Sequence, residues 1–275
     1  KHQLKCRHYL RYCDDFILLS DDVDELGAAK TAIREFLQTR LQLQLNPRYG
    51  QILPLSNGVD FLGYIVNRDY KLVRKRVINN LEEKLQQFKN KLLEEQGKEL
   101  RIHYDYPQLL KLWAVLSSYL GHFAHADSYR LQQSVIKRHN WLAEFFSLDD
   151  RESGTIKPRA RFCHPQIWRN IAEQYGYYRH IFPATVLLFQ VGAYFEFYDT
   201  PAVLVLELLQ LQPLAANHRR ALYGFPLRLE DYYCRRLLTA GFTLVVIKQS
   251  GIIIQRLHQR LPQYKLIYNH QGVNK

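Results

Sequence analysis

The sequence predicts an α+β protein, in which β-hairpins and a helix are followed by a helical segment and then by a small α/β domain. Three observations lead to this prediction. In HYLRYCDDFILLS, residues 8–20, apolar and aromatic residues flank a polar tip, which is typical of two strands joined by a tight turn. Residues 21–41 and 76–96 place apolar side chains at helical spacing. Strand-like and helix-like runs alternate over residues 184–249.

The charge of the chain points to nucleic acid. Its 275 residues contain 38 Lys and Arg against 26 Asp and Glu, a formal net charge of +12. Neutralisation of backbone phosphates by basic side chains supplies affinity for nucleic acid of any sequence. The alternative is a basic surface that only keeps the protein soluble. No apolar run is long enough to span a membrane and no signal peptide is recognisable, so we expect a cytoplasmic protein without a membrane partner.

Cysteine and methionine usage gives two further expectations. None of the four cysteines forms a CxxC pair, which disfavours a disulfide framework or a zinc site and favours a reducing compartment. The chain contains no methionine, even at its first position. We therefore expect it to be the C-terminal part of a longer protein.

The first part of the chain, residues 1–75, is predicted to consist of hairpins around one helix. Asp22 and Glu25 have the spacing of a capping box at the start of that helix. Short strands are expected after the helix, interrupted at Asn46-Pro47 and at Asn57-Gly58. The second of these pairs is a hairpin-turn signal.

The rest of the chain is predicted to form a helical segment, a linker and a second domain. Residues 76–146 are expected to be helical, beginning with the amphipathic helix 76–96. Residues 147–170 are polar and charged and contain proline, which is typical of a linker. The small α/β domain would then occupy residues 171–275. The apolar face of the first helix comprises Val77, Leu81, Leu85, Phe88 and Leu92.

Two adjacent carboxylates, Asp14 and Asp15, lie between the two apolar runs of the first predicted hairpin. Neighbouring carboxylates repel each other and resist burial, so a packed sheet holds such a pair only if cations or protons neutralise it. Magnesium suits oxygen ligands of this kind, and paired magnesium ions serve phosphoryl transfer. The alternative is a turn with solvated acids, as expected for Asp21-Asp22 and Asp149-Asp150.

The motif Tyr12-Cys13-Asp14-Asp15 resembles the Tyr-X-Asp-Asp motif of reverse transcriptases. Further segments resemble that family in the same order, namely LNPRYGQI, then Phe61-Leu62-Gly63-Tyr64 as the hairpin that grips the primer strand, then SYLGHFAHADSYRL as part of a helical thumb. The resemblance covers residues 1–146. It is greatest to bacterial enzymes related to group II introns, particularly those of diversity-generating retroelements.

This resemblance implies a partial polymerase palm over residues 1–75 and a thumb over residues 76–146. It implies that Asp14 and Asp15 contribute to a site for two Mg²⁺ ions, completed by an upstream aspartate that this chain lacks. The chain alone is then expected to be inactive, and its full-length parent to be an RNA-directed DNA polymerase that binds an RNA template, a DNA primer and deoxynucleotides. The residues implied to contact nucleic acid here are Tyr12, Arg48, Phe61, Leu62, Gly63 and Tyr64, with Tyr49 where the family commonly has lysine.

The second domain carries a different resemblance. LLFQVGAYFEFYDTPA is similar to the start of the mismatch-recognition domain of MutS proteins, domain I, which has a Phe-X-Glu triplet after a glycine. Later segments follow the same domain's pattern as far as Gln249. The resemblance implies that Tyr194, at the phenylalanine position, stacks on a base and that Glu196 hydrogen-bonds it. Alternatively, Tyr194, Phe195 and Phe197 are ordinary core or surface aromatics.

The function expected from the sequence is that of a reverse transcriptase fragment, bacterial or phage-encoded, joined to a MutS-like domain that binds distorted or mismatched nucleic acid. The second hypothesis is a non-catalytic nucleic-acid-binding module, and a third is a mismatch-repair component. The third is disfavoured because the sequence has no GxxxxGK[ST] phosphate loop. The sequence leaves open whether an accessory protein or a structured RNA also binds. His122 and His125 are spaced to ligate a metal, but packing or contact with phosphate is the preferred interpretation.

Overall fold

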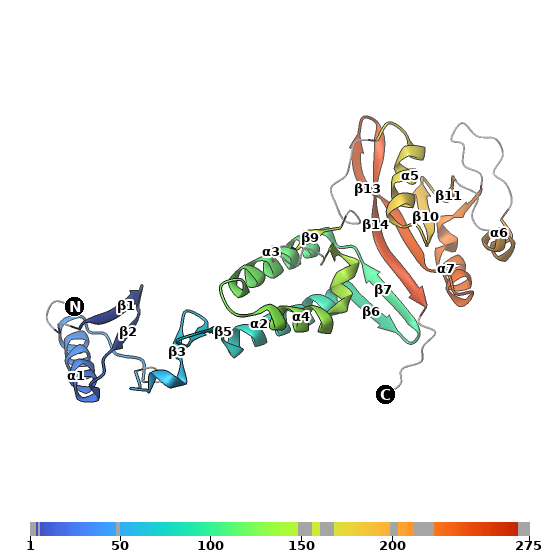
Figure 1. Cartoon of the computed structure of the whole chain (residues 1–275). Coiled ribbons are helices and arrows are strands. Elements are labelled where there is room, and N and C mark those ends of the chain that lie inside the picture. Colours follow the sequence, from blue (N-terminus) through green and yellow to red (C-terminus); the bar gives the residue numbers. More distant parts are fainter. Residues whose placement is uncertain are drawn as a thin grey trace. The chain divides into compact units, whose positions relative to one another are not determined.

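The structure is a computed structural model whose elements are labelled in Figure 1. It divides into two compact units, residues 1–78 with 126–128 and residues 79–125 with 129–275, and each is described by itself. Among the described residues, no helix has the length and the apolar character needed to cross a membrane. The described residues are Leu4, 6–47, 50–147, 156–159, 168–198, 203–211 and 223–268.

The first unit begins with the predicted hairpin and helix. Strands β1 (His8–Tyr12) and β2 (Asp15–Leu19) pair antiparallel, and helix α1 spans Val23–Arg40. The Asp22 carboxylate caps the helix by accepting the backbone N–H groups of Asp24, at 2.8 Å, and Glu25, at 3.3 Å. The second bond of a capping box is replaced, because the Glu25 carboxylate accepts the Ser20 hydroxyl. The prediction was therefore right for the cap and wrong for the reciprocal bond.

A three-stranded antiparallel sheet completes the first unit, with β3 (Val59–Phe61), β4 (Tyr64–Val66) and β5 (Lys71–Val73). The hairpin turn lies at Leu62-Gly63, where both residues have positive φ, 50° and 86°. The prediction of a turn at Asn57-Gly58 was wrong, because these residues end a 3-10 turn that precedes β3. No strand forms in the described residues between α1 and β3, although short strands were predicted there.

Three of the helices in the second unit follow one another in the chain and pack through apolar faces. Helix α2 runs over Lys75–Leu92, from the first unit into the second, and α3 (Tyr106–Phe123) and α4 (Tyr129–Arg138) follow. The prediction that the first of these helices continues to residue 96 was wrong. It ends at Leu92, and β6 (Leu93–Gln96) and β7 (Glu99–His103) form a hairpin. The buried side chains of the helices are Leu81, Leu85, Leu92, Leu109, Leu112, Leu116, Leu120, Phe123 and Val135.

That hairpin belongs to a seven-stranded sheet with the order β12-β11-β10-β13-β14-β7-β6. The pair β10–β13 is parallel and every other pair in this sheet is antiparallel. Five strands therefore come from the predicted α/β domain and two from the predicted helical thumb. The five are β10 (Val186–Val191), β11 (Tyr194–Phe197), β12 (Tyr223–Pro226), β13 (Leu244–Ile254) and β14 (Leu257–Tyr268).

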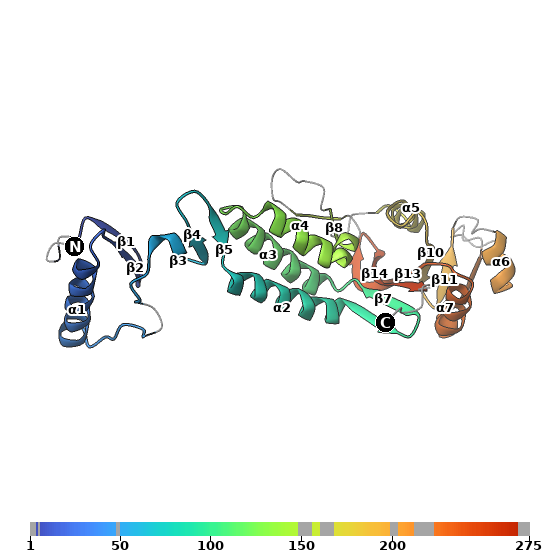
Figure 2. The same ribbon diagram turned by 60° about the horizontal axis from the view of Figure 1, so that its bottom comes forward.

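Strands β7 and β14 are neighbours in this sheet (Figure 2), and further hydrogen bonds join the segments around them. The backbone N–H of Tyr104 donates to the Gln263 carbonyl at 2.8 Å. The Glu144 carboxylate accepts the Tyr104 hydroxyl at 2.7 Å and the Lys265 ammonium at 2.9 Å. Inside the predicted linker, the Ile156 carbonyl accepts the Trp113 indole N–H at 3.0 Å. The helices and the sheet of the second unit are thus held together by contacts between residues that are far apart in the sequence.

The sheet has a helix layer on each face. Helix α5 (Ile171–Ile181) packs on one face through Tyr175 and Tyr178, whose rings contact Phe189 of β10. Helices α6 (Val203–Leu209) and α7 (Glu230–Thr239) cover the other face, where Phe195 and Phe197 of β11 join their core. That core consists of Leu188, Phe195, Phe197, Val205, Leu209, Phe225, Cys234, Leu237, Leu238, Leu244, Val246 and Leu266.

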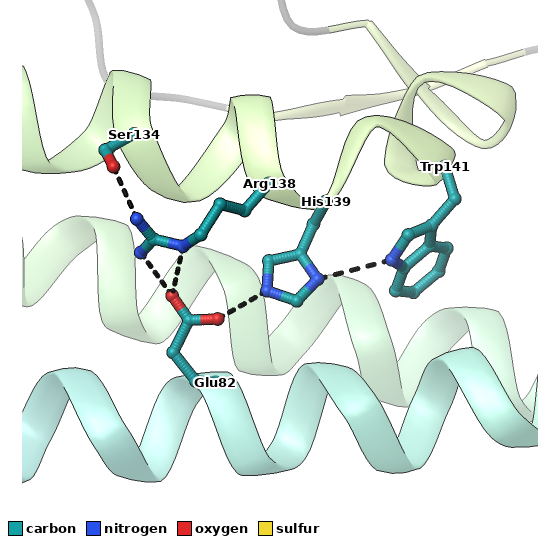
Figure 3. Close-up of polar contacts among 5 residues, drawn as sticks. All are labelled: Glu82, Ser134, Arg138, His139 and Trp141. Carbon is teal, nitrogen blue, oxygen red and sulfur yellow. Dashed lines mark hydrogen bonds and ion pairs between the residues drawn. The ribbon is translucent and has the colours of Figure 1, made fainter. Parts of the chain in front are cut away.

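A polar cluster joins α2 to the end of α4 (Figure 3). The Arg138 guanidinium donates to the Glu82 carboxylate, and the His139 ring nitrogen Nε2 lies 2.6 Å from the same carboxylate. The Trp141 indole N–H, which can only donate, is 3.3 Å from His139 Nδ1. His139 Nδ1 is therefore the acceptor, and the proton that bonds Glu82 lies on Nε2.

This cluster should make stability depend on acid pH. Burial alone would raise the pKa of Glu82, but hydrogen bonds from His139 and Arg138, with the Arg138 charge, lower that pKa below its ordinary value. Its stabilising contribution is therefore complete above the pKa of the unfolded chain and is lost as the pH falls toward the folded value. We expect Glu82→Gln to lower the free energy of unfolding by about 1 kcal/mol at pH 7. Glu83→Gln, a neighbouring exposed glutamate, is the control.

Urea unfolding of both variants at pH 7 and at about pH 3.5 measures this effect, since an unperturbed glutamate has a pKa of about 4.3. The loss in Glu82→Gln should shrink at the lower pH, because the carboxylate of the unfolded wild-type chain is then largely protonated, which removes part of the contribution of the folded-state charge. A loss that is equal at both pH values would contradict the role given to the Glu82 charge.

Candidate nucleic-acid interface

Tyr194 is the first residue of β11, directly after the turn that leaves β10. In this hairpin Val191 pairs with Tyr194, and Gly192 takes the positive φ of 60° that the turn requires. Side chains alternate across a strand, so Phe195 faces the α7 core while Tyr194 and Glu196 face the α5 side. Phe195 is fully buried, whereas Tyr194 is 45% exposed. Phe195 and Phe197 are therefore core aromatics, whereas Tyr194 lies at the surface and its stacking on a base stays a prediction.

Glu196 shares the face of Tyr194 but is only 3% exposed. Its carboxylate accepts the Tyr198 hydroxyl at 2.6 Å. The Tyr198 ring in turn contacts Tyr175 of α5, with centroids 5.2 Å apart, and Phe189 of β10, at 6.3 Å. The carboxylate is therefore an internal hydrogen-bond acceptor that holds the β11 strand against α5. Tyr194 is the member of the pair that presents its ring to solvent.

A buried arginine, which the sequence did not predict, hydrogen-bonds residues next to this site. Arg260 of β14 is 2% exposed, and its guanidinium lies 5.1 Å from the centre of the Phe189 ring. The guanidinium donates to the Gln190 carbonyl and to the Gln174 side-chain oxygen, the latter at 2.9 Å. These partners are 70 and 86 residues away in the sequence, so nothing local distinguishes Arg260 from a surface arginine.

Gln190 also ties the end of β10 to the neighbouring strand. Its side-chain oxygen accepts the backbone N–H of Gln249 in β13 at 3.0 Å. Gln190 precedes Val191, which pairs with Tyr194. The bonds of Gln190 to Gln249 and Arg260 therefore connect the turn before Tyr194 to strands β13 and β14. The strand end that carries Tyr194 is thus fixed by its neighbours.

The other candidate residues, Asp14 and Asp15, lie at the tip of the β1–β2 hairpin. Cys13 turns the chain with a φ of 52°, and the Arg11 side chain donates to its carbonyl at 2.6 Å. The expectation of a packed sheet around the pair was wrong, since all of β1 and both aspartates are exposed. Solvent can stabilise two exposed carboxylates, so the hairpin does not itself demand a cation.

Two exposed carboxylates fit magnesium in part, because this ion keeps several waters when it binds one or two carboxylates. Among the described residues, no group of three or more His, Cys, Asp or Glu side chains could hold a metal ion. This statement covers His122 in α3 and His125 just after it, so it gives no support to a metal site there. The role of the pair in magnesium binding stays a prediction.

The predicted primer-grip segment forms the turn between β3 and β4. Phe61 pairs with Tyr64 across the turn, and Leu62 at its tip is 41% exposed. The Lys71 ammonium lies 4.9 Å from the centre of the Tyr64 ring, and burial raises the pKa of the Tyr64 hydroxyl. Tyr12, at the end of β1, is 60% exposed. Arg48 lies outside the described residues.

Comparison with protein families gives one result. Residues 170–265 match the family MutS domain I. The match runs from the cap of α5 into β14, so it contains Tyr194, Glu196 and Arg260. It confirms the MutS-like part of the sequence prediction and supports nucleic-acid binding by this segment. Comparison with curated proteins gave no match. The resemblance of residues 1–146 to reverse transcriptases stays a prediction.

Proposed function

We propose that residues 170–265 bind a duplex at a mispaired or distorted step, with the Tyr194 ring stacked on a base. The observation that carries this proposal is the 45% exposure of Tyr194 at a strand end, within a segment that is similar to MutS domain I. Stacking of a base on an aromatic side chain is worth about 1–3 kcal/mol. Insertion between bases costs least free energy where pairing is already weak. An exposed ring on a fixed strand end should therefore bind mispaired steps in preference to matched ones.

In this proposal Glu196 is a positioning residue. Its carboxylate is buried and accepts the Tyr198 hydroxyl, so it supports the strand on which Tyr194 stands. The affinity for matched nucleic acid comes from the basic side chains of a chain whose net charge is +12. Tyr194 adds the preference for mispaired steps.

Binding of the full chain to two DNA duplexes that differ by one mismatched pair tests this function. We expect the mismatched duplex to bind at least about fivefold more tightly, which corresponds to about 1 kcal/mol of net stacking. Fluorescence anisotropy at several salt concentrations gives both affinities, and both should fall as salt rises. Equal affinities for the two duplexes would refute mismatch preference, and failure to bind either duplex would refute the proposed function altogether.

We also propose that residues 1–146 form part of a reverse transcriptase in the product translated from the natural start codon of the gene. The supporting observation is that a hairpin with Asp14 and Asp15 at its tip, a helix, a second hairpin at Phe61–Tyr64 and further helices follow in the order of that family. If magnesium binds, the two aspartates would hold it with water and other ligands, and the ions would stabilise charge in phosphoryl transfer.

The two proposals are compatible within one protein. Most of α2 and all of α3 and α4 lie in one unit with the MutS-like segment, and the β6–β7 hairpin between α2 and α3 joins its sheet, so nucleic acid bound at Tyr194 would have a fixed position relative to these helices. We propose that the MutS-like segment holds mispaired primer–template. The alternative is a binding module without catalysis, and the exposure of Asp14 and Asp15, which needs no cation, is the observation that favours it.

A further inference from the structure

The β13–β14 hairpin extends beyond both strands that flank it (Figure 1). On one side, the last β13 residue that pairs with β10 is Ile247. On the other side, pairing of β14 with β7 begins only at Tyr264. Residues 248–262 therefore form a two-stranded ribbon, which we call the β13–β14 ribbon.

The tip of this ribbon is apolar and exposed. Ile252 and Ile253 are 47% and 57% exposed, an unusual state for two adjacent isoleucines. The turn that follows is built from Gln255 and Arg256, both with positive φ. Ser250 steadies the irregular pairing before the tip, since its hydroxyl donates to the Gln259 carbonyl at 3.1 Å. The two isoleucines are thus displayed on a structured turn.

The charge that the tip displays is basic. Of the three Lys and Arg residues in the ribbon, Lys248 is paired with Glu230 at 2.7 Å and Arg260 is buried. Arg256, at the turn, is therefore the exposed one, and the ribbon contains no Asp or Glu. A surface of this kind complements a polyanion, with the arginine suited to phosphate and the isoleucines to the apolar faces of bases.

The ribbon and Tyr194 are at the same end of the sheet. Strands β10 and β13 are parallel, so the end of β10 that leads to Tyr194 and the tip of the ribbon point the same way. The Gln249 N–H bond to Gln190 joins the base of the ribbon to that end of β10. Arg260 adds its bonds to Gln190 and Gln174. A duplex that contacts Tyr194 would therefore meet the base of a ribbon that is held in place.

We propose that the tip of the β13–β14 ribbon binds a groove of the same duplex that Tyr194 contacts, with Ile252 and Ile253 against the bases and Arg256 against the backbone. This inference rests on the proposed function and adds a second, sequence-independent contact to it. A two-stranded ribbon fits a DNA groove, and aliphatic side chains can wedge between base steps.

Three variants of the full chain separate this contact from that of Tyr194. We expect Ile252→Ser with Ile253→Ser to weaken binding of matched and mismatched duplex by about tenfold each, leaving their ratio unchanged, because the tip reads no mismatch. Arg256→Gln should reduce the slope of log affinity against log salt by about one, since one phosphate contact is lost. Leu204→Ser, at an aliphatic residue of α6 that is 67% exposed, is the control and should bind as wild type does.

The outcomes are distinguishable. If wild type binds mismatched duplex preferentially and the tip variants bind with unchanged affinity and salt slope, the ribbon inference is wrong and the proposed function stands. If wild type binds no duplex, both fail. Sedimentation of the same proteins tests whether the tip instead binds a second copy of the chain. That would be the conclusion if wild type formed a dimer and the isoleucine variant were monomeric with unchanged duplex affinity.

Discussion

Replacing Tyr194 by alanine is expected to abolish the preference for mispaired duplex. The exposed ring is lost while Phe195, the neighbour that packs in the core, stays in place. Removal of one base–aromatic stack costs about 1–3 kcal/mol, so affinity for the mismatched duplex should fall by about 5- to 150-fold. Affinity for the matched duplex should change little, because insertion of the Tyr194 ring is favoured only where base pairing is already weak. Titration of both duplexes by fluorescence anisotropy measures the two effects.

Two further variants make this prediction specific. Tyr194→Phe keeps the ring and removes only the hydroxyl, so the preference should persist. Tyr232→Ala removes a tyrosine of α7 that is 54% exposed, on the side of the sheet opposite to Tyr194, and should bind as wild type does. If Tyr194→Ala kept the full preference, or if Tyr232→Ala lost as much, the site would have to lie elsewhere on the segment.

The second large effect is expected at Asp14 and Asp15. In the gene product translated from its natural start codon, Asp14→Asn with Asp15→Asn should abolish primer extension on an RNA template with magnesium. Asparagine keeps the shape of the side chain but removes the negative charge that attracts a divalent cation. Both side chains are exposed, so the substitutions should leave the fold intact. Extension of a labelled primer, resolved on a gel, is the measurement.

Asp21→Asn is the matched control, because Asp21 is an exposed aspartate shortly after β2. It should extend the primer as wild type does. Extension by the Asp14 and Asp15 variant at the wild-type rate would show that these residues hold no catalytic metal. If neither wild type nor variant extended the primer while both bound duplex, the protein would be a binding module and the polymerase proposal would be abandoned.

The sequence by itself determined the structure of short segments whose conformation is set by interactions between neighbouring residues. The hairpin of residues 8–19 follows from apolar strands around a polar tip, and the start of α1 follows from the Asp22 cap. Helix α7 ends where Gly241, with a φ of 87°, breaks the helical backbone. The sequence also identified the MutS-like segment, because spaced motifs such as the one around Tyr194 are local patterns.

Contacts between distant segments decided the rest. Residues 93–96, LEEQ, have helical propensity, yet they form β6 because Gly97 turns the chain and β7 finds a partner in β14. The burial of Arg260 and the exposure of Tyr194 likewise depend on which strands become neighbours. A strand satisfies its backbone hydrogen bonds only through another strand, and no local pattern specifies a partner that lies more than a hundred residues away.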